Sequence, residues 1–380
     1  MPLPFGVYRA DHVGSLLRAA PVLQGRSDVA ANKISPSDLR AIEDKHIADI
    51  VTKEIDSGLR SITDGEFRRA FFHLDFLQHL DGVEIRGGLQ STSTSKEGFI
   101  PPRLVVTGKL GHPKPIQVDD FHFLEQQIAK NGATGKVTTK VCIPSPTMVH
   151  FRGGRDTIDA TAYPDLDPFF ADLARVYQEE LADLYAAGCR TVQLDDTNLA
   201  YLCDPGMRSE AESRHGDANA LARRYAHLIN KSIEKRPGDM TVGIHLCRGN
   251  HRSRWFAQGG YEPVAEVLFK ELNVDAYFLE FDDARSGDFS PLRHLPPNKV
   301  VVLGVMGSKK PELDDKAEIV GRLHEAAGFC GKGIDQLCLS HQCGFSSTME
   351  GNDLSEEQQF AKIRLEVEIA KEVWGQDLSK

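Results

Sequence analysis

The chain has 380 residues, of which 41% are hydrophobic and 26% charged, which indicates a soluble globular protein with one large α/β barrel or two ordinary domains. The net charge of -10, without a Lys/Arg cluster, argues against a nucleic-acid-binding surface. No segment is suited to span a membrane, and residues 1–5 lead into Asp11 and His12 without the pattern of a signal peptide.

The amino-terminal half alternates predicted strands with predicted helices. Ser35 can cap a helix that begins at Pro36, Asp38 suits its positive end, and Gly58 is expected to end it. Residues 82–111 are rich in Gly, Ser, Thr and Pro, which predicts a β-hairpin with a tip near residues 91–98. The other elements expected here are strands at 7–12, 61–64 and 137–143 and a helix at 118–130.

The carboxyl-terminal half continues the alternation. Its clearest helix covers residues 165–187, where large apolar side chains recur at helical spacing and Gly188 supplies the stop. Further helices are expected at 210–234, 263–272, 314–327 and 355–373, and strands at 191–194, 243–247, 276–279, 299–305 and 336–340. These make about eight βα units, so residues 1–380 are predicted to form a single (β/α)8 TIM barrel with the hairpin inserted after its second strand.

Polar residues follow the predicted strands repeatedly, and active sites of such barrels lie at the carboxyl ends of the strands. These residues are His12, Ser15, Asp64, Glu66, Asp195, Asp196, His245, Cys247, Glu280, Lys309 and Cys343. Each has an ordinary interpretation when taken singly: Asp195 and Asp196 as a helix N-cap, Glu66 as a surface carboxylate, Lys309 as half of a solvated pair. Their convergence on one rim predicts an active site there.

A metal site is predicted from four of them. Along a strand, His245 and Cys247 point to the same face and can reach one ion, while Glu280 and Cys343 end or follow two later strands. One His, two Cys and one Glu are a plausible first shell for Zn²⁺. The alternative is a core histidine with buried cysteines. The seven cysteines, odd in number and irregularly spaced, suggest reduced thiols in a cytoplasmic protein.

Three further motifs accompany this quartet: Val13-Gly14-Ser15, then Gly65-Glu66 followed by His79-Leu80-Asp81-Gly82, then Gln193-Leu194-Asp195. Together with the quartet they resemble the cobalamin-independent methionine synthases, specifically their carboxyl-terminal catalytic barrel, over essentially the whole chain. The resemblance implies that His245, Cys247, Glu280 and Cys343 bind zinc. It also implies that Ser15 holds the homocysteine carboxylate, while Glu66 and Asp195 bind the amino group of the substrate.

The chain departs from that family in three respects. The full-length synthases carry a second, amino-terminal barrel that helps to bind folate; Lys309 stands where they have a proton-supplying His; and Asp196 replaces a Glu. The methyl donor therefore stays open between a folate, a methyl-corrinoid protein and another alkyl compound. Lys309 and His12 are the candidates to protonate or stabilise the leaving group.

The expected activity is zinc-dependent transfer of a methyl group to a thiol, with homocysteine giving methionine as the first expectation and 5-methyltetrahydrofolate or a methyl-corrinoid as donor. One alternative is alkyl transfer to another thiol, for example by epoxide opening. A hydrolase using zinc-activated water is disfavoured by the sulfur-rich ligand set. A closed structural zinc site in a binding protein is the third alternative. The expected partners are small molecules, with a homodimer possible.

Overall fold

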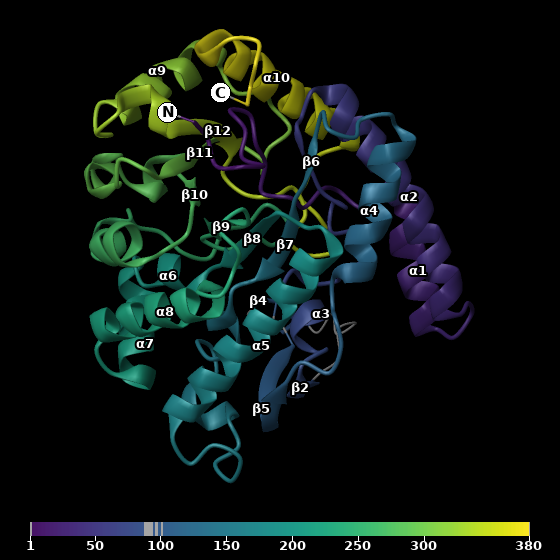
Figure 1. Cartoon of the computed structure of the whole chain (residues 1–380), viewed down its shortest axis with the longest axis vertical. Coiled ribbons are helices and arrows are strands. Elements are labelled where there is room, and N and C mark those ends of the chain that lie inside the picture. Colours follow the sequence, from purple (N-terminus) through teal and green to yellow (C-terminus); the bar gives the residue numbers. More distant parts are fainter. Residues whose placement is uncertain (1, 87–93, 96–97, 100–101, 380) are drawn as a thin grey trace.

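The computed structural model describes residues 2–86, 94–95, 98–99 and 102–379, and its parallel strands are surrounded by helices (Figure 1). Six strands form one sheet in the order β12-β11-β10-β9-β8-β7, with every neighbouring pair parallel. Their bounds are β7 (Val141–Pro144), β8 (Thr191–Asp196), β9 (Thr241–Leu246), β10 (Ala276–Glu280), β11 (Val300–Met306) and β12 (Leu337–His341).

Shorter pairings continue the ring. Strand β1 (Ser61–Ile62) pairs in parallel with β6 (Thr138–Thr139), which only Lys140 separates from β7. On the other side of the sheet, Ala10 forms a parallel bridge with Leu339 of β12. The Ala10 segment, β1, the β6–β7 strand and β8 to β12 occupy the positions of a (β/α)8 barrel, which confirms the predicted fold class. The first predicted strand, at 7–12, is reduced to this single bridge.

The helices cover the outside of the strands (Figure 1). In chain order they are α1 (Ala20–Ala30), α2 (Pro36–Ser57), α3 (Leu74–Leu77), α4 (Val118–Lys130), α5 (Leu166–Ala187), α6 (Asn198–Tyr201), α7 (Pro205–His215), α8 (Ala218–Ile233), α9 (Lys316–Ala327) and α10 (Glu356–Trp374). The start of α2 is as predicted, because Ser35 and Asp38 form a reciprocal capping box. Its end at Gly58 and that of α5 at Gly188 are left-handed, with φ of 93° and 110°.

Two helix predictions are wrong. The single helix expected at 210–234 is divided between α7 and α8, because Gly216 takes a φ of 83° and Asp217 caps the second helix through the N–H of Asn219. The helix expected at 263–272 is a 3-10 turn, Glu262–Val264, followed by a π-helical segment, Val267–Glu271. Helix α1 was not expected from the apolar pattern.

The predicted hairpin lies after β1, as expected. Strand β2 (Asp81–Arg86) pairs antiparallel with β5 (Arg103–Gly111), and β3 (Thr94–Ser95) pairs antiparallel with β4 (Gly98–Phe99). Of the predicted tip at 91–98, residues 91–93 and 96–97 lie outside the described residues. Among the helices that the structure describes, none is long and apolar enough to cross a membrane.

Candidate metal and substrate site

Strand alternation decides which side chains face the barrel interior. On β10, Tyr277 and Leu279 pack in the large apolar cluster beneath the helices, whereas Phe278 belongs to a small cluster formed largely by residues of the barrel strands. Glu280 has the same parity as Phe278 and therefore points inward. On β9, Ile244 and Leu246 join the outer cluster, so His245 also points inward. The same alternation turns Asp195 of β8 inward.

Three of the four predicted metal ligands come together. The ligand atoms of His245, Cys247 and Cys343 all lie within 4.8 Å of one another, and all three residues are buried. The Sγ atoms of the two cysteines are 3.3 Å apart. His245 Nδ1 lies 3.2 Å from the carbonyl oxygen of Phe278, and its Nε2 is buried without a hydrogen-bond partner. An imidazole whose one nitrogen contacts a carbonyl while the other is bare and faces two sulfurs is a typical metal-ligand arrangement.

The electrostatics of this trio favour one ionised thiol. The hydrogen bond from Cys247, with help from His245, holds the pKa of Cys343 well below its usual range. The same contact, together with burial, raises the pKa of Cys247. A shared thiol proton is what two metal-ligating cysteines would release on binding an ion. Two sulfurs and one imidazole nitrogen fit a soft divalent metal.

Glu280 is not part of this trio. Its Oε1 accepts hydrogen bonds from Lys309 Nζ at 3.1 Å and Arg285 Nη2 at 2.8 Å, and its Oε2 accepts one from the N–H of Arg248 at 2.9 Å. Burial alone would raise the pKa of Glu280, but Lys309, Arg248 and Arg285 lower it to about 2. Glu280 is therefore a buried, ionised carboxylate beside the trio, and its role as a fourth ligand stays a prediction.

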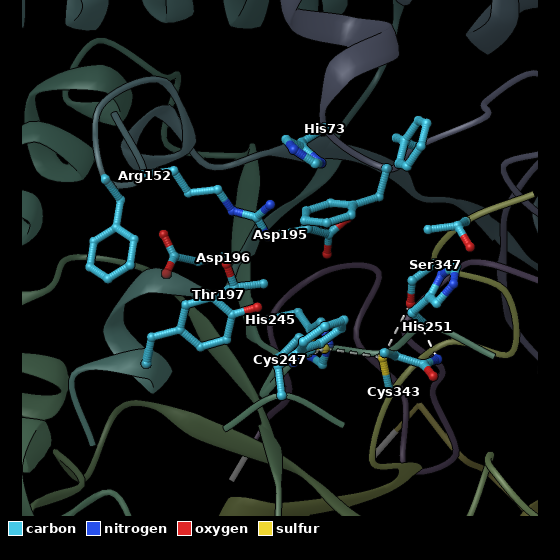
Figure 2. Close-up of a pocket in the computed structure, with 18 of the residues that line it drawn as sticks. His73, Arg152, Asp195, Asp196, Thr197, His245, Cys247, His251, Cys343 and Ser347 are labelled. Carbon is cyan, nitrogen blue, oxygen red and sulfur yellow. Dashed lines mark hydrogen bonds between the residues drawn. The ribbon is translucent and has the colours of Figure 1, made fainter. Parts of the chain in front are cut away.

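The predicted substrate-binding residues share one cavity with the trio. This cavity has a volume of about 410 Å³, and Ser15, Glu66 and Asp195 line it together with His245, Cys247 and Cys343 (Figure 2). Ser15 faces Gly344 so closely that a Cβ there would lie 1.9 Å from the Ser15 Oγ. Any side chain at position 344 would therefore clash with the Ser15 hydroxyl, so this position requires glycine.

Glu66 carries the marks of a functional carboxylate. It is 2% exposed, its backbone has a φ of 59°, and its Oε2 has no hydrogen-bond partner. A non-glycine residue in the left-handed region stores strain that the surroundings must impose. Burial raises the pKa of Glu66 to about 7 and that of Asp195 to about 6. Arg69 Nη1 lies 3.7 Å from Glu66 Oε2, and Gln193 Nε2 donates a hydrogen bond to Asp195 Oδ1 at 2.7 Å, so a positively charged ligand would add to these partners.

Neither predicted catalytic residue lines the cavity. Lys309 is bound to Glu280 as described. His12 Nε2 lies 2.9 Å from the carbonyl oxygen of Ser61 and 3.3 Å from Glu54 Oε1. Burial and the neighbouring Lys140 hold the pKa of His12 well below its usual range, so its ring is neutral. Their catalytic roles stay predictions.

Asp196 has a structural position. It points away from the barrel interior, its Oδ1 accepts the N–H of Leu199 at 2.9 Å, and its Oδ2 accepts the hydroxyl of Thr147. Asp196 thus accepts an amide of the first turn of α6 from the position before its N-cap, Thr197, and it also lines the cavity.

Several cavity residues had not been predicted. His73, Arg152 and His251 reach the cavity from loops and short turns (Figure 2), as does Asn250, and Phe72, Phe151, Tyr201 and Phe256 add aromatic surface. Loop residues follow no periodic pattern, so no hydrophobic spacing could have marked them. The one sequence signal that could have identified these residues is their position, since each follows a barrel strand in the chain.

Comparisons with known proteins agree with this geometry. Residues 10–372 match the family model described as the catalytic domain of the cobalamin-independent synthases. The chain is 43% identical to the uncharacterized protein YxjH of Bacillus subtilis (strain 168), with 97% of this chain and 95% of that protein covered. It is 36% identical to the solved structure of a putative vitamin-B12-independent methionine synthase from Listeria monocytogenes, with a TM-score of 0.77 over 99% of this chain and 100% of that one.

A more distant relative is the 5-methyltetrahydropteroyltriglutamate–homocysteine methyltransferase of Thermosynechococcus vestitus, at 27% identity over 88% of this chain. The match covers 40% of that longer protein. Since the family model covers nearly the whole barrel and the strongest similarities extend end to end, the chain belongs to the cobalamin-independent methionine synthase family and corresponds to its catalytic barrel.

Proposed function

We propose that this chain transfers a methyl group to the sulfur of a thiol, with homocysteine giving methionine, at a zinc ion held by His245, Cys247, Cys343 and Glu280. The observation that carries the proposal is the trio of converging soft ligands on the wall of a cavity that also holds two unsatisfied or raised-pKa carboxylates. We further propose that residues 1–380 act as one catalytic barrel.

The chemistry needs these residue types. A free thiol has a pKa of about 8.5, so most of it is protonated and poorly nucleophilic at neutral pH. Zinc, when bound, would supply a deprotonated substrate sulfur and hold it in place. Two cysteinates and a glutamate carry more negative charge than the dication neutralises, which keeps a third sulfur, that of the substrate, nucleophilic.

The protein's own residues would orient the amino acid. Glu66 Oε2 and Asp195 can accept hydrogen bonds from the substrate ammonium, and Ser15 can donate its hydroxyl to the substrate carboxylate. Holding the ammonium and the carboxylate of the amino acid restricts the position of its side chain and directs its sulfur toward the cysteines. Such fixed orientation lowers the entropic cost of attack on the methyl group.

Glu280 is proposed to complete the ligand set by moving from its cations to the ion. Lys309, Arg285 and the N–H of Arg248 hold its carboxylate ionised beside the trio. The donor is proposed to be 5-methyltetrahydrofolate or a methyl-corrinoid. The relative whose name contains the folate donor is more than twice the matched length, so its donor contacts do not transfer to this chain.

Metal analysis combined with X-ray absorption tests the proposal. The purified protein should contain about one zinc per chain, with two sulfur ligands. Addition of L-homocysteine should raise the sulfur count to three. An unchanged two-sulfur shell with homocysteine and with a panel of other thiols would indicate a structural site. A third sulfur from another thiol alone would replace homocysteine as the substrate.

A further inference from the structure

Part of the active-site cavity is used neither by the metal trio nor by the residues that bind the amino acid. His73 and Arg152 line this part together with Phe72, Phe151 and Tyr201. In Figure 2, Asp195 lies between the two cysteines and the pair His73 and Arg152. In the proposed function the thiol substrate occupies the space between Asp195 and the cysteines. This part of the cavity is then left for the molecule that donates the methyl group.

His73 has an unused ring. It immediately precedes α3, is 6% exposed, and its Nδ1 is buried without a hydrogen-bond partner. Among the described residues, neither of its ring nitrogens makes a side-chain hydrogen bond, whereas its ring packs against Phe72 at a centroid distance of 4.6 Å. Burial, reinforced by Arg152, holds the pKa of His73 well below its usual range, so the ring is neutral.

Arg152 brings a positive charge to the same place. The guanidinium of Arg152 interacts with the hydroxyl of Tyr201, and the carboxylates of Asp196 and Glu210 line the same cavity. The charge of Arg152 acts on His73 and also opposes the rise of the Tyr201 pKa that burial causes. Cys247 acts on the same Tyr201, so this tyrosine lies between the cation and the metal trio.

We propose that, with a donor that is not a corrinoid, His73 and Arg152 form the subsite for its leaving group, a planar group whose departing atom is oxygen or nitrogen and carries or gains negative charge. In the step, the bond from sulfur to the methyl carbon forms while the bond from that carbon to the departing atom breaks and leaves its electron pair there. The neutral ring of His73 donates an N–H hydrogen bond to that atom, and Arg152 stabilises the charge. No oxidant or reductant is required, and a departing nitrogen takes up the proton that the thiol loses.

This assignment differs from the predicted one for a physical reason. Lys309 is tied to Glu280 and His12 to Ser61 and Glu54, and neither lines the cavity. A neutral imidazole can act as an electrophile in enzymes, because its N–H donates a hydrogen bond to the atom on which negative charge develops. The aromatic walls suit a planar ring.

The inference rests on the proposed function, so its test measures the thiol half separately. The probe is 4-nitrobenzenesulfonate, a planar oxyanion and the leaving group of its methyl ester. Isothermal titration of the zinc-loaded protein should give a single site, weakened at least about tenfold in Arg152→Gln and about threefold or more in His73→Leu. The exposed His79→Leu and Arg364→Gln should bind it as the wild type does.

Methyl transfer to L-homocysteine provides the second measurement. With methyl 4-nitrobenzenesulfonate the rate should fall roughly tenfold to a hundredfold in His73→Leu, whereas with methyl iodide, whose leaving group needs no hydrogen bond, it should stay within about twofold. His73→Gln, which keeps an N–H, should recover most of the loss. Equal losses with both methylating agents, or no binding of the anion by the wild type, would overturn the subsite.

X-ray absorption separates the two proposals. If the third sulfur still appears with L-homocysteine while His73→Leu and Arg152→Gln leave anion binding unchanged, the leaving-group subsite is wrong and the thiol site stands. If the third sulfur never appears in the wild type, the proposed function itself fails. If His73→Leu loses its zinc, the substitution has disturbed the fold of the site. Anion binding and the rates with the two methylating agents are then compared between His73→Gln and the wild type.

Discussion

The two cysteines of the trio have unequal surroundings, and this sets the outcome of replacing one. Cys343 is the sulfur that His245 and Cys247 hold in its ionised form. We therefore expect Cys343→Ser to lose most of the bound zinc and all methyl transfer, since a serine hydroxyl does not ionise near neutral pH. Metal content per chain measures it.

The matched control is Cys330→Ser, because Cys330 is also buried but lies after α9, away from the cavity. It should keep its zinc. Full zinc retention in Cys343→Ser would remove Cys343 from the ligand set.

The pH dependence of activity depends on Glu66. Burial raises its pKa to about 7, so the carboxyl is protonated below that pH and cannot hold a substrate ammonium. We expect kcat/KM for the thiol to rise with pH through about 7, because this parameter reports groups of the free enzyme. In Glu66→Gln the limb near 7 should disappear. An unchanged profile in Glu66→Gln would exclude Glu66 as the group that titrates.

At the scale of single residues, strand parity predicted which strand side chains point inward, whereas Cys247 and Cys343 lie beyond the ends of β9 and β12. His245, Glu280 and Asp195 point inward because alternate residues of a strand share a face. The partners of Glu280 could not be predicted in this way, since Arg285 reaches it from a loop and Lys309 from beyond the next strand. His73 was missed for the same reason.

At the scale of elements, local chemistry predicted boundaries where one residue type dominates. Ser35 and Gly58 mark the ends of α2, and Gly188 marks the end of α5, because caps and left-handed glycines act within one turn. The break between α7 and α8 was missed, since the polar residues around Gly216 continue a helical pattern that this glycine interrupts. The π-helical segment after β9 has no sequence rule of comparable strength.

The capping box of α2 allows a prediction at this scale. Ser35 Oγ accepts the N–H of Asp38 at 3.1 Å, and the Asp38 carboxylate accepts the N–H of Ser35 at 2.9 Å. Ser35→Ala should lower the free energy of unfolding by about 1 kcal/mol. Urea unfolding followed by circular dichroism measures it, and Ser35→Asp, which restores a cap, should recover most of the loss. Equal stability of wild type and Ser35→Ala would show that the cap contributes nothing.

At the scale of the whole molecule, the barrel and its inserted hairpin were predictable because regular alternation of strands and helices permits few architectures. The packing of the hairpin on the barrel was not, because it depends on single contacts between distant segments. One of them joins the end of β5 to α5: His112 Nε2 lies 2.7 Å from Glu180 Oε2, and Glu180 also accepts the N–H groups of Ile116 and Gln117.

This contact makes the stability of the fold depend on pH. The hydrogen bond that His112 donates to Glu180 raises the pKa of His112 above its ordinary value of 6.5, against the opposing effect of burial. A histidine whose pKa is higher in the folded state stabilises the fold fully below its unfolded pKa of about 6.5, and this contribution disappears as the pH rises through the folded value. His112→Gln removes the titration and keeps a polar side chain. Urea unfolding of equally metal-loaded proteins should show the wild type more stable than His112→Gln at pH 6, with the difference shrinking steadily toward pH 8.5. A difference that stays constant or grows over this range would mean that His112 does not join the hairpin to α5 as a charged group.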